Sequence, residues 1–245
     1  MTFSLPKVSD ALSSLTLPVS GKNITMRPMI VRDIKALAIA AMKKDDPIGL
    51  YKTAISILNN SISEDIKMEK LPSADLELAF LKLKSISSGD SETYNFECPK
   101  CKTANQIEIN FDTDPVVDVK DYEVDSRVIL KSVNGGEVGV NMKPFTYEAL
   151  LKSTGNKKME EIDQQFEVIK GCVASIFEGE EILLRENIPD KSFDEWFNTL
   201  NVKQLQEISK YMETIPSVAI NIDKECEKCG ESIKETIKGL SDFLV

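Results

Sequence analysis

Two short cysteine pairs constrain the fold of this chain more than any other feature. Cys98 and Cys101 form one Cys-x-x-Cys pair, Cys226 and Cys229 form the other, and 124 residues lie between them. Each pair can place two sulfurs on one tight turn, and two such turns complete a four-thiolate shell, the usual closed structural zinc site. Gly230 directly follows the second pair and permits the backbone turn that it needs. The sequence therefore predicts structural zinc bound by these four cysteines.

The absence of histidine narrows the chemistry further. With no histidine in the chain, Ser-His and Cys-His nucleophiles and mixed Cys/His metal sites are excluded. Three other uses of the thiols stay open: a thioredoxin-like redox pair, a deaminase-type catalytic zinc, and reduced thiols without a metal. The fifth cysteine, Cys172, lies beside Val173 in an apolar segment, so we expect a buried small hydrophobe and not a fifth ligand.

Charge and hydropathy disfavour several partners. The 245 residues carry 30 basic and 40 acidic side chains, a net charge of −10, whereas nucleic-acid binders are usually basic and anionic membrane surfaces attract cations. No apolar stretch approaches the roughly 18 to 20 residues that span a bilayer. The first residues also lack the apolar core of a signal peptide, so we expect reduced cysteines in a cytosolic compartment.

An internal repeat organises the rest of the chain. The Met-Arg-Pro run at 26–28 is echoed by Met-Lys-Pro at 142–144. Each run follows a short predicted strand and precedes predicted helices. Each copy then ends with a cysteine pair that lies between two strands of alternating apolar and polar residues. The cysteine pairs lie further apart in the sequence than the two proline runs do, which an insertion in the second copy would explain. A hairpin is expected between the copies, around Asn134-Gly135-Gly136.

Apolar spacing predicts about three helices in each copy. In the first, we expect helices at 31–44, 51–62 and 71–87. In the second, the apolar positions from Met159 to Ile176 step by three and four, which predicts one long helix. Ser192 and Glu195 form a candidate capping box for the helix that follows.

These observations predict an α+β fold of two tandem related units. Residues 1–22 would form an extended arm, 23–115 the first unit and 116–245 the second, each with short strands, about three helices and a final cysteine turn. A zinc-ribbon-like pair of Cys-x-x-Cys hairpins would then join the ends of the two units. An ordinary ribbon separates its pairs by about 15 to 20 residues.

The order of motifs over residues 1–110 resembles the baseplate protein family of T4-like bacteriophages, in its hub-subunit and hub-assembly group. The segments that carry the resemblance are 15–18, 21–22, 26–33, 71–75, 81–87 and 98–101. An arginine expected in the third helix is replaced by Lys82 or Lys84, so no function is transferred to that position.

The resemblance implies a structural or assembly subunit of the tail baseplate of a contractile-tailed phage, and no enzyme. It would be made in the host cytoplasm and reside in the virion tail. Its partners would be other baseplate proteins and, as a further option, copies of itself, with no nucleic acid, membrane or small-molecule substrate. The alternative function is that of a zinc-ribbon module that binds nucleic acid or is associated with transcription. A thiol redox enzyme or metalloenzyme is the third hypothesis.

Overall fold

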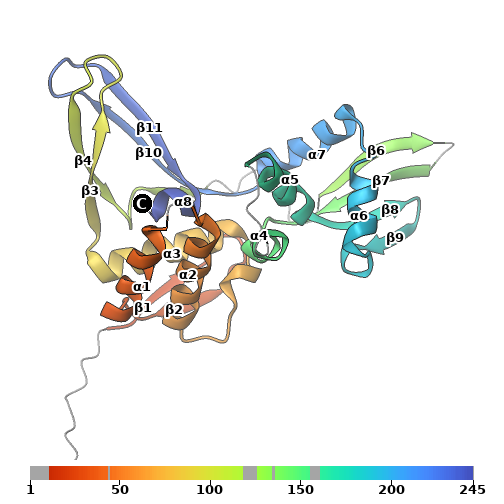
Figure 1. Cartoon of the computed structure of the whole chain (residues 1–245), viewed down its shortest axis with the longest axis horizontal. Coiled ribbons are helices and arrows are strands. Elements are labelled where there is room, and N and C mark those ends of the chain that lie inside the picture. Colours follow the sequence, from red (N-terminus) through yellow and green to blue (C-terminus); the bar gives the residue numbers. More distant parts are fainter. Residues whose placement is uncertain (1–10, 44, 118–125, 134–135, 155–160, 245) are drawn as a thin grey trace, which may run out of the picture. The chain divides into compact units, whose positions relative to one another are not determined.

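A computed structural model describes residues 11–43, 45–117, 126–133, 136–154 and 161–244. Helices and small antiparallel sheets alternate along these residues, which confirms the α+β class. Spatial contacts divide the described residues into two compact units (Figure 1). Unit 1 contains those of 11–68, 74–117 and 218–244, and unit 2 contains those of 69–73 and 126–217. This division follows contacts and not sequence likeness, so the tandem duplication stays a prediction.

Unit 1 begins with a small hairpin. Strand β1 (Ser13–Thr16) pairs antiparallel with β2 (Asn23–Met26), which is the strand expected at 23–26. The turn between them is held by the fully buried Asp75, whose carboxylate oxygens accept the backbone N–H groups of Val19 at 2.8 Å and Ser20 at 2.9 Å. Residues 11–22 are therefore tied to the helical core of unit 1.

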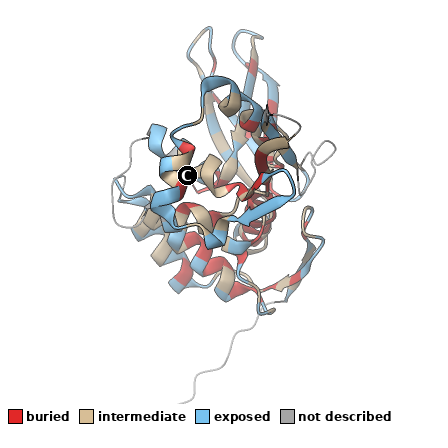
Figure 2. Cartoon of the chain, turned by 90° about the vertical axis from the view of Figure 1, so that its right-hand side faces the viewer, coloured by how far each residue is buried: buried red, intermediate tan, exposed pale blue. Residues whose placement is uncertain are grey.

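The helices of unit 1 follow the predicted spacing closely. They are α1 (Val31–Ala41), α2 (Pro47–Ser61) and α3 (Ser73–Ser88), and the short 3-10 turn η1 (Met68–Lys70) lies at the boundary with the 69–73 segment of unit 2. Asp46 caps α2, because its carboxylate accepts the Gly49 N–H at 2.8 Å and proline occupies the first turn. Leu58 of α2 and Phe80 of α3 are almost completely buried, so these two helices supply the core of the unit (Figure 2).

Two long hairpins complete unit 1. The first pairs β3 (Ser91–Glu97) with β4 (Ala104–Asn110), and the second pairs β10 (Val218–Glu225) with β11 (Ser232–Lys238). The short strand β5 (Pro115–Val117) adds to β10, and helix α8 (Gly239–Phe243) follows β11. Strands therefore flank both cysteine pairs, as the sequence predicts.

Unit 2 is a four-stranded antiparallel sheet with helices. Its sheet has the order β6 (Arg127–Val133), β7 (Gly136–Met142), β8 (Val173–Glu178) and β9 (Glu181–Leu184). Its helical elements are α4 (Tyr147–Thr154), α5 (Glu161–Gly171), the 3-10 turn η2 (Arg185–Asn187), α6 (Asp190–Phe197) and α7 (Val202–Thr214). Phe193, Phe197 and Ile208 belong to one buried cluster with Cys172 and Val173. The hairpin expected around Asn134-Gly135-Gly136 is confirmed by β6 and β7, while residues 134 and 135 themselves lie outside the described residues.

The structure corrects two expectations in unit 2. The helix predicted to reach Ile176 ends at Gly171, and the next residues form β8, paired with β7 and β9. Alternate burial along β8 shows why: its residues suit a strand as well as a helix, and sheet pairing decides between them. The capping box expected at Ser192 is also wrong, because α6 already begins at Asp190.

A capping box does occur at the next helix. The Asn201 side chain accepts the Gln204 N–H at 3.1 Å, and the Gln204 side chain accepts the Asn201 N–H at 2.9 Å.

Among the described residues, no helix is both long and apolar enough to cross a membrane.

Candidate metal centre

Each cysteine pair occupies the turn of one long hairpin in unit 1. In the first turn, the Cys98 N–H donates to the Thr103 carbonyl at 2.9 Å, and the Lys102 N–H donates back to the Cys98 carbonyl at 3.0 Å. In the second, Cys226 and Glu231 make the equivalent bond at 2.8 Å, and the Gly230 N–H reaches the Cys226 carbonyl at 2.9 Å. The two turns thus share one hydrogen-bond pattern, although their sequences differ.

The backbone conformation of the two turns also matches. Gly230 has a φ of 70°, and Lys102, which stands at the same place after its own cysteine pair, has a φ of 57°. Left-handed backbone of this kind favours glycine and is uncommon for a lysine. The first turn therefore adopts the same left-handed geometry with a lysine in place of the glycine.

The four thiols converge at the tips of the two hairpins. Cys98 Sγ lies 3.6 Å from Cys229 Sγ, and Cys101 Sγ lies 3.6 Å from Cys226 Sγ. All four sulfurs lie within 4.8 Å of one another, and none forms a disulfide. A tetrahedral zinc ion with Zn–S bonds of about 2.3 Å places its sulfurs about 3.8 Å apart. The sulfur positions therefore fit a four-thiolate metal site.

Residues around the thiols connect the two hairpins. Asn105, only 4% exposed, donates its side-chain N–H to the Thr103 carbonyl at 2.8 Å and accepts the Glu227 N–H at 3.0 Å through its side-chain oxygen. Lys100 forms an ion pair with Glu231 at 3.1 Å across the same joint. Such outer contacts orient ligands in metal sites. No sequence pattern indicated Asn105, because an asparagine in a strand carries no signal for this role.

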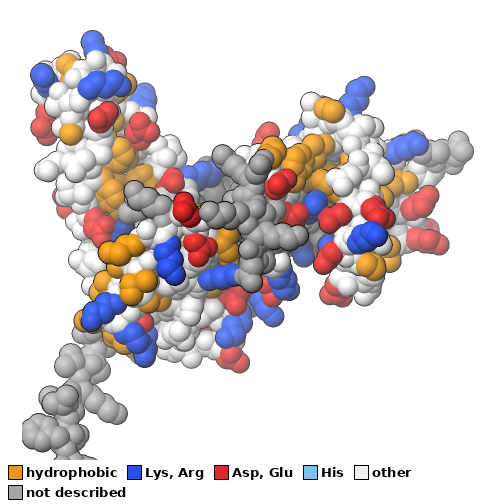
Figure 3. Space-filling model, viewed as in Figure 1, with side chains coloured by type: hydrophobic (Ala, Val, Ile, Leu, Met, Phe, Trp, Pro, Cys, Tyr) orange, Lys and Arg blue, Asp and Glu red, His pale blue; other side chains and the backbone are white. Residues whose placement is uncertain are grey.

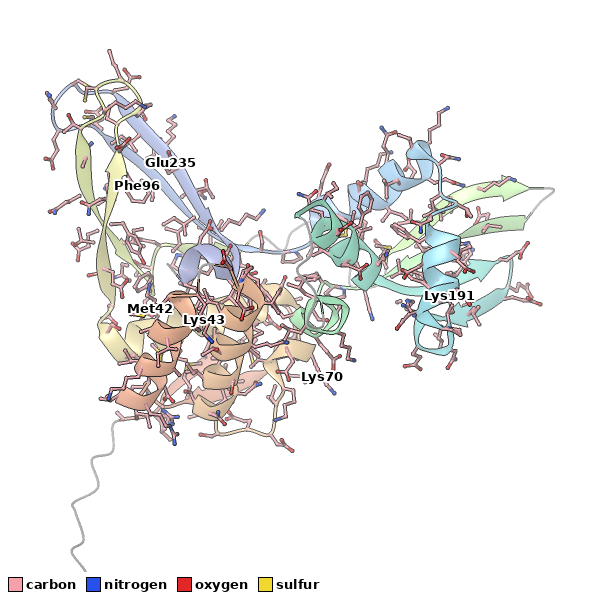
Figure 4. The ribbon with its side chains drawn as sticks, in the orientation of Figure 1. Met42, Lys43, Lys70, Phe96, Lys191 and Glu235 are labelled. Atoms are coloured by element: carbon pink, nitrogen blue, oxygen red, sulfur yellow. The ribbon has the colours of Figure 1, made fainter. Side chains whose placement is uncertain are left out.

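Apolar packing around the site is slight. Cys98 and Cys226 are buried together with Ile233, and the partly buried Phe96 and Cys101 pack against them. Figure 4 labels Phe96 on the first hairpin. Two of the three buried members of this cluster are thus cysteines, so the hairpin tips have little core beyond their own sulfurs.

The pKa values of two thiols in the cluster are shifted in opposite directions. Hydrogen bonds from the side chain and backbone of Thr103 lower the pKa of Cys101 to about 6. A backbone hydrogen bond from Glu231 lowers the pKa of Cys229, but burial and the three neighbouring thiols outweigh it and raise this pKa to about 12. Four sulfurs so close together cannot all ionise by themselves, because thiolates repel one another. A bound divalent cation removes this obstacle, and thiolate ligands favour soft or borderline ions such as zinc.

The site offers no evident catalytic position. Four sulfur ligands close a tetrahedral shell, whereas catalytic zinc keeps a position for water or substrate. The redox alternative is not favoured either, since thioredoxin-like pairs open a helix and these pairs lie in hairpin turns. Among the described residues, no other group of three or more Cys, Asp or Glu side chains gathers as these four cysteines do.

The fifth cysteine lies elsewhere and behaves as expected. Cys172 is 0% exposed in the buried cluster of unit 2, and burial raises the pKa of its thiol to about 12. It is a small core residue. The four clustered cysteines, by contrast, all belong to unit 1, so a metal ion bound there would join two hairpins within one compact unit.

Comparison with known proteins identifies the family of this chain. A family model described as "T4 bacteriophage base plate protein" matches residues 11–245. No curated protein sequence and no solved structure matches the chain. The match extends the likeness seen over residues 1–110 to both units and all four cysteines. The chain belongs to the T4 bacteriophage base plate protein family.

Proposed function

We propose that this baseplate protein is a structural or assembly subunit of the hub region in a contractile-tailed phage. It acts through contacts with other baseplate proteins and catalyses no reaction. It is made in the host cytoplasm and joins the tail baseplate there. A zinc ion bound by Cys98, Cys101, Cys226 and Cys229 gives unit 1 a fixed shape. The observation that carries the proposal is the convergence of these four sulfurs in a chain of this family.

The geometry supports a structural and not a catalytic role for the ion. In this site the ion would supply cross-linking, because it would hold two hairpin tips that share only a small apolar cluster. The chain has no histidine to act as a general base near it. The residues around the ligands, Asn105 and Lys100 among them, make bonds that join the hairpins.

The assembly role is tested by following the protein during infection. Tail intermediates from cells infected with the parent phage are separated by sedimentation and probed for this chain. We expect it in hub-containing intermediates, and we expect these to be missing when its gene carries an early stop codon. Normal hub assembly without the protein would contradict the assembly role.

The zinc site is tested separately on the purified chain. Elemental analysis should give one zinc per chain, and Cys226→Ser should abolish it. Cys172→Ser is the matched control, because this cysteine lies outside the cluster and should leave the zinc content unchanged. Salt-sensitive binding of DNA or RNA by the purified protein would instead favour the nucleic-acid module, which the net charge of −10 argues against.

A further inference from the structure

Helix α1 in unit 1 exposes several large apolar side chains, while Ala36, Leu37 and Ala40 on the same helix are half-buried. Its one buried residue is a carboxylate, Asp33, which is 5% exposed. Large apolar side chains along it face solvent: Val31 is 68% exposed, Ile34 50% and Met42, at the C-cap, 81%. A surface helix normally turns its apolar stripe toward the core. Within the described residues of unit 1, this exposed apolar stripe of α1 is left uncovered.

Charge anchors this helix to the rest of unit 1. The Asp33 carboxylate accepts a hydrogen bond from the Arg27 guanidinium at 3.0 Å and from the Ile30 N–H at 3.1 Å. Arg27 in turn donates to the Pro28 carbonyl at 2.8 Å. These bonds fix the start of α1 without using its exposed apolar side chains, which leaves that face free for another role.

The exposed apolar side chains form one continuous surface, which we call the α1 face. Positions 31, 34, 38 and 42 step by three and four, so they lie along one side of the helix. Its members are Val31, Ile34, Ala38, Ile39 and Met42. Exposed cations stand beside them: Arg32, Lys35 and Lys43. Figure 3 shows hydrophobic side chains over α1 with Lys and Arg side chains next to them, and Figure 4 labels Met42 and Lys43 at its end.

We propose that the α1 face binds an amphipathic helix of another baseplate protein, with an apolar stripe flanked by Asp and Glu. The inference rests on the proposed function, since it names the surface through which the subunit makes one of its contacts. Contiguous exposed apolar surface marks interaction sites on soluble proteins. Helices present such stripes at intervals of three and four residues, the same spacing that the α1 face shows.

Charge complementarity favours one of three possible binding partners for the α1 face: an acidic helix, a second copy of the chain or an anionic membrane. The chain as a whole carries −10, yet three cations border this face. A second copy docked through the same face would bring three more cations into the interface, and like charges oppose that pairing. An anionic membrane would attract the cations but repel the rest of the acidic chain. An amphipathic helix with acidic flanks can pack against the apolar stripe and pair with the cations beside it.

Binding of purified baseplate proteins to the full chain tests the proposal. Each protein of the same baseplate is measured separately against the immobilised wild-type chain by biolayer interferometry. We expect one of them to bind, and Ile34→Asp or Met42→Asp to weaken its binding by about 30-fold or more, as for a central interface residue. Val202→Asp is the matched control, because Val202 is 73% exposed on α7 and should leave the affinity unchanged.

A double charge reversal tests the chemistry of the partner. Lys35→Glu combined with Lys43→Glu should slow association and flatten its dependence on salt, because steering by opposite charges would be lost. Circular dichroism and zinc content confirm that each variant is folded. Since all of these side chains are exposed, we expect both measurements to match the wild type.

Several outcomes would overturn the inference. One is equal binding by wild type and Ile34→Asp, and another is no binding by any baseplate protein. A wild-type dimer that Ile34→Asp dissociates would assign the face to a second copy. Binding to vesicles of phosphatidylcholine and phosphatidylserine in equal parts, lost in Met42→Asp, would assign it to a membrane. If hub intermediates contain the wild type and the α1 variants equally, the proposed function stands and this inference fails.

Discussion

The hairpin tips of unit 1 and the core of unit 2 differ in how much apolar packing stabilises them. At the tips, the buried cluster is Cys98, Cys226 and Ile233. In unit 2, eight buried residues, Phe193 and Phe197 among them, form a cluster with a dozen partly buried neighbours. Helices packed on a sheet bury enough apolar surface to hold themselves, whereas isolated two-stranded hairpins are marginal in water. The four thiols thus lie at hairpin tips whose apolar cluster is much smaller than the core of unit 2.

The largest effect should come from removing the metal ligands. Structural zinc contributes roughly 10 to 16 kcal/mol in small zinc domains, so Cys98→Ser or a chelator should free the hairpin tips. We expect amide hydrogen exchange to rise in β3, β4, β10 and β11, while β7 and β8 of unit 2 stay protected. Equal loss of protection in both units would show that the thiol site does not stabilise the hairpin tips selectively. No change in either unit would show that the tips do not depend on a metal ion.

The reciprocal change is Phe193→Ala in unit 2. Phe193 is 0% exposed and packs against the Trp196 and Phe197 rings, with centroids 5.8 Å and 6.1 Å away. Loss of a buried phenylalanine costs about 3 to 5 kcal/mol of unfolding free energy. We expect a lower midpoint of denaturant unfolding with one zinc per chain retained. Zinc loss in this variant would show that the two regions are not independent.

A smaller effect should follow from Asn105→Ala. The asparagine bonds the backbone of both cysteine turns, and loss of such an outer contact lowers metal affinity by about 10-fold or more. Competition with a colorimetric chelator measures the change. Asn95→Ala, at an exposed position of β3, is the control and should release zinc as the wild type does. Identical release from both variants would exclude Asn105 from holding the site.

The smallest effect concerns the reactivity of Cys172, the cysteine outside the four-thiol cluster. At pH 8, well below its pKa of about 12, buried Cys172 should stay protonated and shielded from a thiol reagent. With chelator present, we expect four cysteines per folded chain to react quickly and the fifth only on unfolding. Five fast thiols would mean that the core of unit 2 opens readily.

The sequence alone predicted the parts of the site that obey local rules. Cysteine spacing predicted which four thiols gather, and alternating residues on both sides predicted the strands that position them. Periodicity failed at 172–178, where the same apolar spacing suited helix and strand and sheet pairing decided. Asn105 acts through contacts that depend on how two distant hairpins meet, so no local pattern could indicate it. The sequence predicted a helix at 31–44, and only the structure shows which of its apolar side chains face solvent.

The separation of the two cysteine pairs also sets an order in time. Cys226 follows Cys101 by 125 residues, and nearly all of unit 2 is encoded between them. At a synthesis rate of roughly 5 to 20 residues per second, the first pair leaves the ribosome about 6 to 25 seconds before its partners. During that interval only two of the four thiols exist. A metal ion shared by all four thiols would therefore bind only after unit 2 has been synthesised.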